Sequence, residues 1–140
     1  MLSRSSNESF ARVAAASFIA QLDPTIEELS DIKTAVSEAV TNCIVHAYKE
    51  ELGTIYIWTR IFEGGTVEIK VRDYGCGIEN IAKAMEPLYT TLGGERAGLG
   101  FAVMQSFMDK LTVTSAPSKG TCVTMSKKLS LRMGDNAKQG

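Results

Sequence analysis

The pattern of apolar and polar positions predicts two helices in the first third of the chain. Apolar residues recur every three or four positions up to Leu22, and again from Ile26 to about Tyr48. The stretch Ser5-Ser6-Asn7-Glu8 fits a capping box for the first helix, and Asp23-Pro24 fits the N-cap and first residue of the second. On this pattern the first helix should bury one stripe, formed by Phe10, Val13, Ala14, Phe18 and Leu22.

Alternation of apolar and polar residues predicts two hairpins farther along the chain. The first joins Thr54–Phe62 to Thr66–Asp73, and the second joins Leu111–Ala116 to Thr121–Leu129. A helix from Phe101 to about Lys110 lies between them. Hairpins give a mostly antiparallel sheet, and helices gathered on one face of it give a two-layer α/β sandwich, which is the fold class we expect.

An acidic residue, Asp73, ends the second predicted strand on its apolar side. Apolar residues alternate with charged ones from Thr66 onward, and the same parity places Asp73 among the apolar ones. A carboxylate in that position is costly unless a partner compensates it. Gly75 and Gly77 follow, and they allow a sharp turn and a close approach to a ligand. Taken alone, the stretch fits a binding site and an ordinary Asp-Gly-type turn about equally well.

A polar stripe runs along the second predicted helix. Glu38, Asn42 and His46 are four residues apart, so their side chains project in similar directions from a segment that is otherwise apolar. An acid, an amide and an imidazole exceed what a solvated face needs, although a polar edge of an amphipathic helix is the plainer interpretation.

The segment from Pro87 to Gly100 has no period and four glycines, and loops of this length in compact domains are usually functional or mobile. Gly98-Leu99-Gly100 directly precedes the predicted third helix, where free N–H groups could cradle a phosphate. A plain helix cap explains such a short motif more often. We also expect a short helix from Ile78 to about Met85.

Composition narrows the class of protein. The 140 residues predict a single domain with an ordered core over about 5–129 and a polar tail over 130–140. A net charge of −1 does not favour binding to nucleic acid, and no apolar run approaches the ~20 residues of a membrane span. Three widely spaced cysteines and no signal peptide indicate a reduced, cytoplasmic protein, and one histidine leaves little room for a histidine-based metal site.

The order of these motifs resembles the ATP-binding (Bergerat) fold of the GHKL superfamily of ATPases and kinases. It runs E-x-x-x-N on a helix, D-x-G-x-G after a strand, a long loop that ends in G-x-G, and Gly120-Thr121 at the start of a strand. Longer strings are similar to the anti-sigma F factors of spore-forming bacteria, the stage II sporulation protein AB family. They are Asn7–Val13, Ala20–Thr25, Val36–Asn42 and Phe107–Asp109.

The resemblance implies a role for each candidate residue. Asp73 would accept a hydrogen bond from the adenine amine, Asn42 would ligate Mg²⁺, and Glu38 would take the proton from the attacking serine. Arg12 would contact protein partners. The nucleotide, ATP or ADP, would be held by Asn42, His46, Asp73, Gly75, Gly77, Arg96, Gly98, Leu99, Gly100 and Thr121.

The resemblance also implies the partners. It describes a homodimer that inhibits a sporulation sigma factor of the sigma F type and phosphorylates a serine of an anti-anti-sigma factor, with no direct contact to nucleic acid or membrane. A kinase for a stress-response sigma factor, a histidine-kinase-type ATPase domain and a binding module without catalysis are the alternatives. The family carries an edge strand before the first helix, whereas only Met1 to Arg4 precede the predicted cap here, which puts that strand and its dimer contacts in question.

Overall fold

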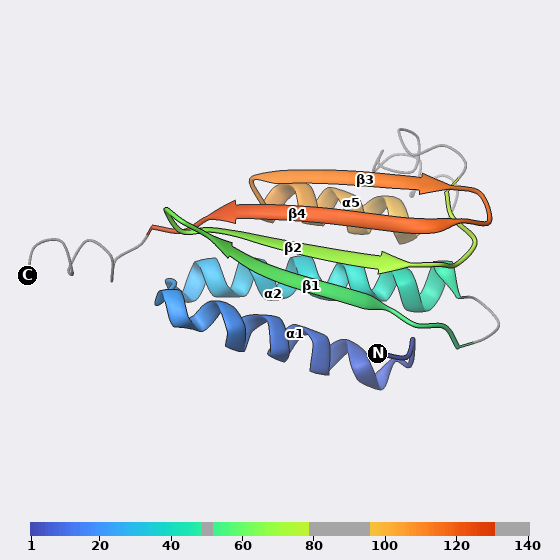
Figure 1. Cartoon of the computed structure of the whole chain (residues 1–140), viewed down its shortest axis with the longest axis horizontal. Coiled ribbons are helices and arrows are strands. Elements are labelled where there is room, and N and C mark those ends of the chain that lie inside the picture. Colours follow the sequence, from blue (N-terminus) through green and yellow to red (C-terminus); the bar gives the residue numbers. More distant parts are fainter. Residues whose placement is uncertain (49–51, 79–95, 131–140) are drawn as a thin grey trace, which may run out of the picture.

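The computed structural model describes residues 1–48, 52–78 and 96–130 of the chain (Figure 1). The helical elements are α1 (Ser6–Ile19), the 3-10 turn η1 (Ala20–Leu22), α2 (Ile26–Asn42), the π-helical turn η2 (Cys43–Ala47) and α5 (Arg96–Phe107). The strands are β1 (Tyr56–Phe62), β2 (Thr66–Asp73), β3 (Lys110–Ala116) and β4 (Gly120–Lys128). The short helix expected from Ile78 and the polar tail fall on residues outside the described ranges, apart from Ile78 and Ser130.

The four strands form one antiparallel sheet in the order β1-β2-β4-β3. Both predicted hairpins are confirmed, and β2 joins them by pairing with β4. In this register Asp73, at the end of β2, lies opposite Thr121 near the start of β4. The sheet therefore brings together two site residues that are far apart in the sequence.

The helices gather on one face of the sheet, so the predicted two-layer sandwich is confirmed (Figure 1). Inward side chains of the strands and the apolar faces of the helices form one core. Its fully buried members include Ile32, Val36, Val40, Val67, Ile69, Val71, Phe101, Met104 and Met125. No helix among the described residues is long and apolar enough to cross a membrane.

The helix caps differ from the predictions. Ser5 has helical dihedral angles (φ −58°, ψ −30°), and its side chain makes no capping hydrogen bond. The Glu8 carboxylate lies 3.7 Å from the Arg12 guanidinium. The second helix is capped by Thr25, whose hydroxyl accepts the Glu28 N–H at 3.0 Å while the Glu28 carboxylate accepts the Thr25 N–H at 2.8 Å. The Asp23-Pro24 prediction is therefore wrong by two residues.

The buried face of α1 also differs from the predicted stripe. Its buried residues are Ala11, Ala15, Ala16 and Ile19, whereas Phe10 is 64% exposed and Phe18 is 42% exposed. Small alanines let α1 pack closely on the rest of the fold. The large apolar residues are left on the outside, where they are available to another surface.

The first residues of the chain form a short pairing at the edge of the sheet, where the resemblance implied an edge strand. Leu2 bridges Thr54, the Met1 ammonium donates to the Ile55 carbonyl at 2.8 Å, and the Ser3 N–H donates to the Gly53 carbonyl at 2.8 Å. The first residues thus pair with the segment that leads into β1. Beyond Ile55 this N-terminal pairing ends, and β1 is an outer strand of the sheet.

Candidate functional site

The carboxylate of Asp73 is buried at the end of β2, with 4% of the residue exposed. Its Oδ1 accepts the Gly75 N–H at 2.9 Å and the Thr121 N–H at 3.2 Å, and its Oδ2 accepts the Cys43 S–H at 3.5 Å. Burial raises the pKa of Asp73, and the hydrogen bonds from Gly75, Cys43 and Thr121 lower it without cancelling that effect. The inward acid predicted from the strand parity is confirmed.

The thiol of Cys43 is part of this environment. Burial, followed by the nearby Asp73 carboxylate, raises the pKa of Cys43, so the thiol stays protonated and acts as a donor. Cys43 lies within the apolar recurrence that predicts the second helix, and the sequence alone did not indicate this contact. The pairing of two residues 30 positions apart has no sequence signal of its own.

The glycine turn after Asp73 packs against protein backbone. A Cβ at Gly75 would lie 2.3 Å from the Ala47 carbonyl oxygen, so no side chain fits there. Gly77 has φ +75°, and a Cβ there would lie 1.9 Å from the Ala116 carbonyl oxygen. These contacts require both glycines for the fold itself. Their part in admitting a ligand stays a prediction.

Hydroxyl groups line the other side of the Asp73 region. Thr121 Oγ1 lies 2.7 Å from Ser115 Oγ, which also accepts the Ile78 N–H at 2.8 Å. Ser115 was not singled out from the sequence. The alternation of the second hairpin does place it opposite Thr121, which is the signal that could have found it.

The polar stripe of the second helix meets the third helix. A Cβ at Gly100 would lie 3.1 Å from Glu38 Oε2 and 3.2 Å from Asn42 Oδ1, so Gly100 of α5 lies directly against these two side chains. Both amide atoms of Asn42 are buried, with no hydrogen-bond partner among the described residues. The structure therefore brings together Glu38, Asn42 and Gly100, three predicted site residues from two helices.

The helix widens immediately after Asn42. Residues Cys43–Ala47 form the π-helical turn, a distortion that is frequent at functional sites. His46 is half-buried in this turn, and its carbonyl accepts the Cys76 S–H at 3.2 Å. The turn thus connects the Asn42 region with the glycine turn after Asp73.

The third helix begins earlier than predicted. It starts at Arg96, so Gly98-Leu99-Gly100 lies within its first two turns and does not precede it. Free N–H groups belong to the first four residues of a helix, which here are Arg96 to Leu99. The backbone of these four residues is helical, and their side chains lie outside the described part of the structure. Most of the expected loop before them is also outside the described ranges.

The predicted partner residue, Arg12, lies on α1. Its guanidinium donates to Ser9 Oγ at 3.0 Å and lies 3.7 Å from the Glu8 carboxylate. The side chain is 37% exposed. Local contacts on one helix hold it at the surface without burying it.

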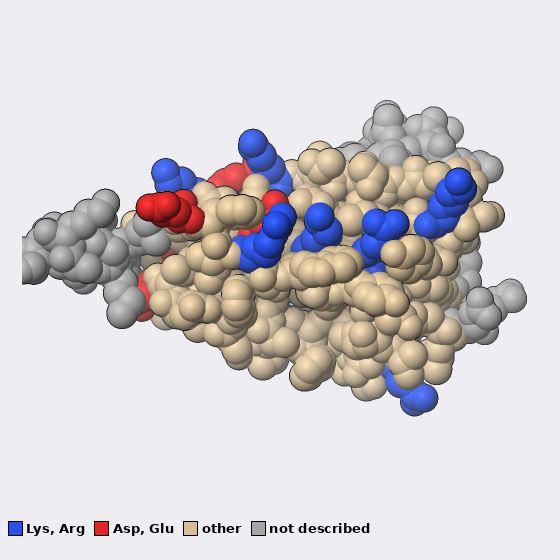
Figure 2. Space-filling model, viewed as in Figure 1, with Lys and Arg blue, Asp and Glu red and all other residues tan. Residues whose placement is uncertain are grey.

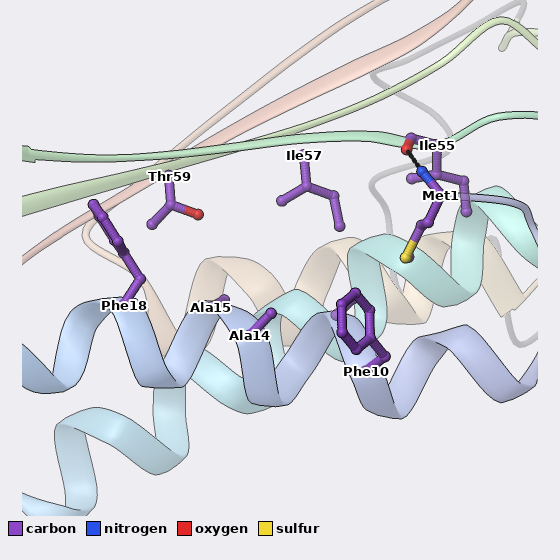
Figure 3. A pocket seen from close by; sticks show the side chains of 9 residues that line it. Met1, Phe10, Ala14, Ala15, Phe18, Ile55, Ile57 and Thr59 are labelled. Atoms are coloured by element: carbon purple, nitrogen blue, oxygen red, sulfur yellow. Dashed lines mark hydrogen bonds between the residues drawn. The ribbon is translucent and has the colours of Figure 1, made fainter.

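An apolar groove lies between α1 and β1 (Figure 3). It has a volume of about 320 Å³, and Phe10 and Phe18 stand at its rim on α1. Ile55 and Ile57 face them from the strand side. This groove contains none of the nucleotide residues predicted from the sequence.

Three comparisons place these observations among known proteins. A family model described as a histidine kinase-like ATPase domain matches residues 4–127. The anti-sigma F factor of Thermoanaerobacter sp. (strain X514) is 62% identical over 127 residues, which cover 90% of this chain and 88% of that protein. The anti-sigma F factor of Clostridium botulinum (strain Eklund 17B / Type B) is 58% identical over 132 residues, with 93% and 92% covered.

A likeness to solved structures concerns the fold alone. The histidine kinase domain of the blue-light activated histidine kinase from Erythrobacter litoralis EL346 superposes with a TM-score of 0.56 at 22% identity. The superposition covers 85% of this chain and 59% of that one. The fold predicted from the order of the motifs is therefore the fold of histidine-kinase-like ATPases.

Proposed function

We propose a catalytic and a regulatory function for this chain, which belongs to the anti-sigma F factor family and carries a histidine kinase-like ATPase domain. The chain is proposed to transfer the γ-phosphoryl group of ATP to a serine of an anti-anti-sigma factor, and to hold a sigma factor of the sigma F type inactive. The observation that carries the proposal is that Glu38 and Asn42 of α2 lie against Gly100 of α5. The turn that continues α2 contacts Asp73 through the Cys43 thiol.

Asp73 is the proposed contact to adenine. Its Oδ1 already accepts two backbone N–H groups, whereas its Oδ2 accepts only the weak thiol donor among the described residues. A carboxylate oxygen has capacity for a further donor, such as the exocyclic amine of adenine. Thr121, beside Asp73 in the sheet, would support the base with its hydroxyl.

Asn42 is the proposed ligand of Mg²⁺. Its side-chain amide is buried and has no hydrogen-bond partner among the described residues, so its oxygen is suited to coordinate a metal ion. One protein oxygen suffices, because Mg²⁺ takes most of its other ligands from water and phosphate. The described residues hold no cluster of three or more acidic, histidine or cysteine side chains that could bind a metal without the nucleotide. When bound, Mg²⁺ would neutralise charge on the phosphates.

Glu38 is the proposed proton acceptor. The serine oxygen would form a bond to the γ-phosphorus as the bond to the β-phosphate oxygen breaks, and ADP would leave. The serine proton would pass to the Glu38 carboxylate, one helical turn from Asn42. The backbone N–H groups at the start of α5, with Arg96, would face the phosphates, and His46 would lie near them.

The regulatory part rests on the surface of α1. Phosphorylation would place a dianion on the partner's interface and drive the partner away, whereas the phosphate-free partner would displace the sigma factor. Arg12 is the proposed contact residue. The apolar groove between α1 and β1, with its exposed phenylalanines, is the proposed surface for the homodimer that the family resemblance implies.

A capture experiment tests the regulatory proposal. The chain is immobilised and offered a sigma factor of the sigma F type with Mg²⁺ and ATP, with ADP, or without nucleotide. We expect capture that depends on nucleotide, and release of the sigma factor when a phosphate-free anti-anti-sigma factor is added. Equal capture in all three conditions, or none, would contradict the proposal.

A further inference from the structure

The face of the sheet opposite the helices exposes large aromatic side chains. β1 directs Tyr56, Trp58 and Phe62 to this open face, with 43%, 46% and 43% of each residue exposed. The rings of Tyr56 and Trp58 stack, with centroids 6.1 Å apart and an angle of 19° between their planes. Exposed aromatic residues gathered on one strand mark an interaction surface more often than single scattered ones do.

Each of the two stacked rings has a cation directly opposite on the neighbouring strand. Tyr56 pairs with Arg72 and Trp58 pairs with Lys70 in the register of β1 and β2. Directly opposite side chains have Cβ atoms about 4.5–5.5 Å apart, and the pattern repeats after two residues, or about 6.7 Å. The open face therefore carries two aromatic–cation pairs in line.

The charge on this face differs from that of the whole chain. Glu68 is the only acid among the outward strand positions, all of which are described, and it is 2.6 Å from Arg60. The remaining outward cations are Lys70, Arg72, Lys110 and Lys128. Figure 2 views this face and shows basic side chains following one another in a row along the sheet, with acids gathered toward one end.

A polar hollow of about 260 Å³ continues the row at the end of the strands. Arg72 and Lys119 line it together with Thr114, whose hydroxyl can donate a hydrogen bond. The Nε atom of Arg72 is buried without a hydrogen-bond partner among the described residues, and its guanidinium lies 4.8 Å from the ring centre of Tyr74. This end of the face is suited to an anionic oxygen.

We propose that the open face binds single-stranded nucleic acid, with bases on Tyr56 and Trp58 and phosphates on Lys70 and Arg72. Sequence-tolerant binding of single strands combines stacking on aromatic rings with a row of cations, and both occur here in register. An acidic peptide would form ion pairs with the cations but would not stack on the aromatic rings. The net charge of −1 predicts no such binding, because it averages this face with the acidic remainder of the molecule.

The only tryptophan of the chain, Trp58, lies in the proposed surface and reports on it directly. The full chain is titrated with an oligouridine of about twelve nucleotides and, separately, with polyglutamate of equal charge. We expect oligouridine to quench the fluorescence. Three or four phosphate contacts would give a slope of about −2 to −3 for the logarithm of the association constant against the logarithm of salt concentration.

Variants then localise the binding, measured by the anisotropy of labelled oligouridine. Trp58→Ala should weaken binding about tenfold to a hundredfold, since stacking on one ring contributes that much for a base. Lys70→Glu should weaken binding and make the salt slope less negative by at least about 0.7. Lys33→Glu changes the charge equally on a helix of the other layer and should leave binding within about twofold.

The outcomes separate the possibilities. Quenching of the unmodified chain by oligouridine, together with binding by anisotropy that both open-face variants weaken and Lys33→Glu leaves within about twofold, supports the proposal. Tighter binding of polyglutamate than of oligouridine would overturn it in favour of an acidic protein partner. Absence of quenching at low salt, or equal weakening by Lys33→Glu, would also overturn it. Because ATP is not required, a failure here is distinct from a failure of the proposed kinase activity.

Discussion

Replacing Asp73 by asparagine should separate nucleotide binding from folding. Asparagine keeps an oxygen where Oδ1 accepts the Gly75 and Thr121 N–H groups. It puts an NH₂ group where Oδ2 now accepts the Cys43 thiol, and where the adenine amine would donate. The substitution therefore preserves the backbone contacts and turns the proposed acceptor into a donor.

The expected loss of ATP affinity follows from these contacts. A hydrogen bond to a charged group contributes about 1.5–3 kcal/mol, and leaving a donor unpaired in a buried site costs about 1–3 kcal/mol more. The sum corresponds to roughly a hundredfold to ten-thousandfold weaker binding. Calorimetric titration with ATP measures it, with Glu63→Gln as a control because Glu63 is an exposed acid in a turn.

The same substitution should stabilise the protein without nucleotide at neutral pH. The pKa of Asp73 is raised mainly by burial, so the folded state holds the proton more tightly than the unfolded state does. The corresponding stability is present below the ordinary carboxyl pKa of about 4, and it is lost as the pH rises through the raised value. Asparagine cannot lose this stability, so its melting temperature should exceed that of the wild type at pH 7–8.

The difference between the two melting temperatures should shrink as the pH falls toward 4. Thermal unfolding of both proteins at several pH values, without nucleotide, measures this trend. A variant that is less stable than the wild type at pH 7–8 would show that the hydrogen bonds outweigh burial. A variant that binds ATP within threefold of the wild type would remove Asp73 from the adenine contact.

Four further predictions concern single residues. Glu38→Ala should bind ATP normally but lose about 10²–10⁴-fold in transfer rate, and undiminished transfer in a single-turnover assay would place the base elsewhere. Gly100→Ala should weaken Mg²⁺-ATP binding at least tenfold in a titration, because its methyl group would press on Glu38 and Asn42; unchanged affinity would mean that the two helices separate easily. Cys43→Ala should weaken ATP binding, and the loss of ATP affinity on acidification should begin at a higher pH, because Asp73 loses the hydrogen bond from the thiol. Cys43→Ser should restore the affinity and its pH dependence. Identical pH dependence in all three proteins would mean that the thiol serves only in packing. Arg12→Glu should weaken capture of the sigma factor tenfold or more at unchanged ATP affinity, and equal capture would end that assignment.

Much of the fold could be predicted because strand alternation depends on local parity. The period of two in β2 predicted the buried position of Asp73 without any knowledge of its neighbours. The order of hairpins and helices predicted the two layers. Such features need no information on contacts between distant residues.

The errors arose where tertiary packing decides. The capping box at Ser5 and the buried phenylalanines of α1 both fit local rules, yet the fold uses the small alanines of α1 for close contact. The third helix begins at Arg96, although its glycines have low helix propensity, because packing against α2 can override propensity. The cation row and the aromatic residues of the open face become one surface only through the pairing of β1 with β2.

The central claim is that Glu38 and Asn42 serve phosphoryl transfer to a serine. The most direct measurement incubates the chain with Mg²⁺, labelled ATP and an anti-anti-sigma partner, and locates the label by mass spectrometry. The proposed function predicts label on a partner serine, with transfer nearly lost in Glu38→Ala and ATP binding retained. Label on a histidine, or transfer that Glu38→Ala leaves unchanged, would contradict it.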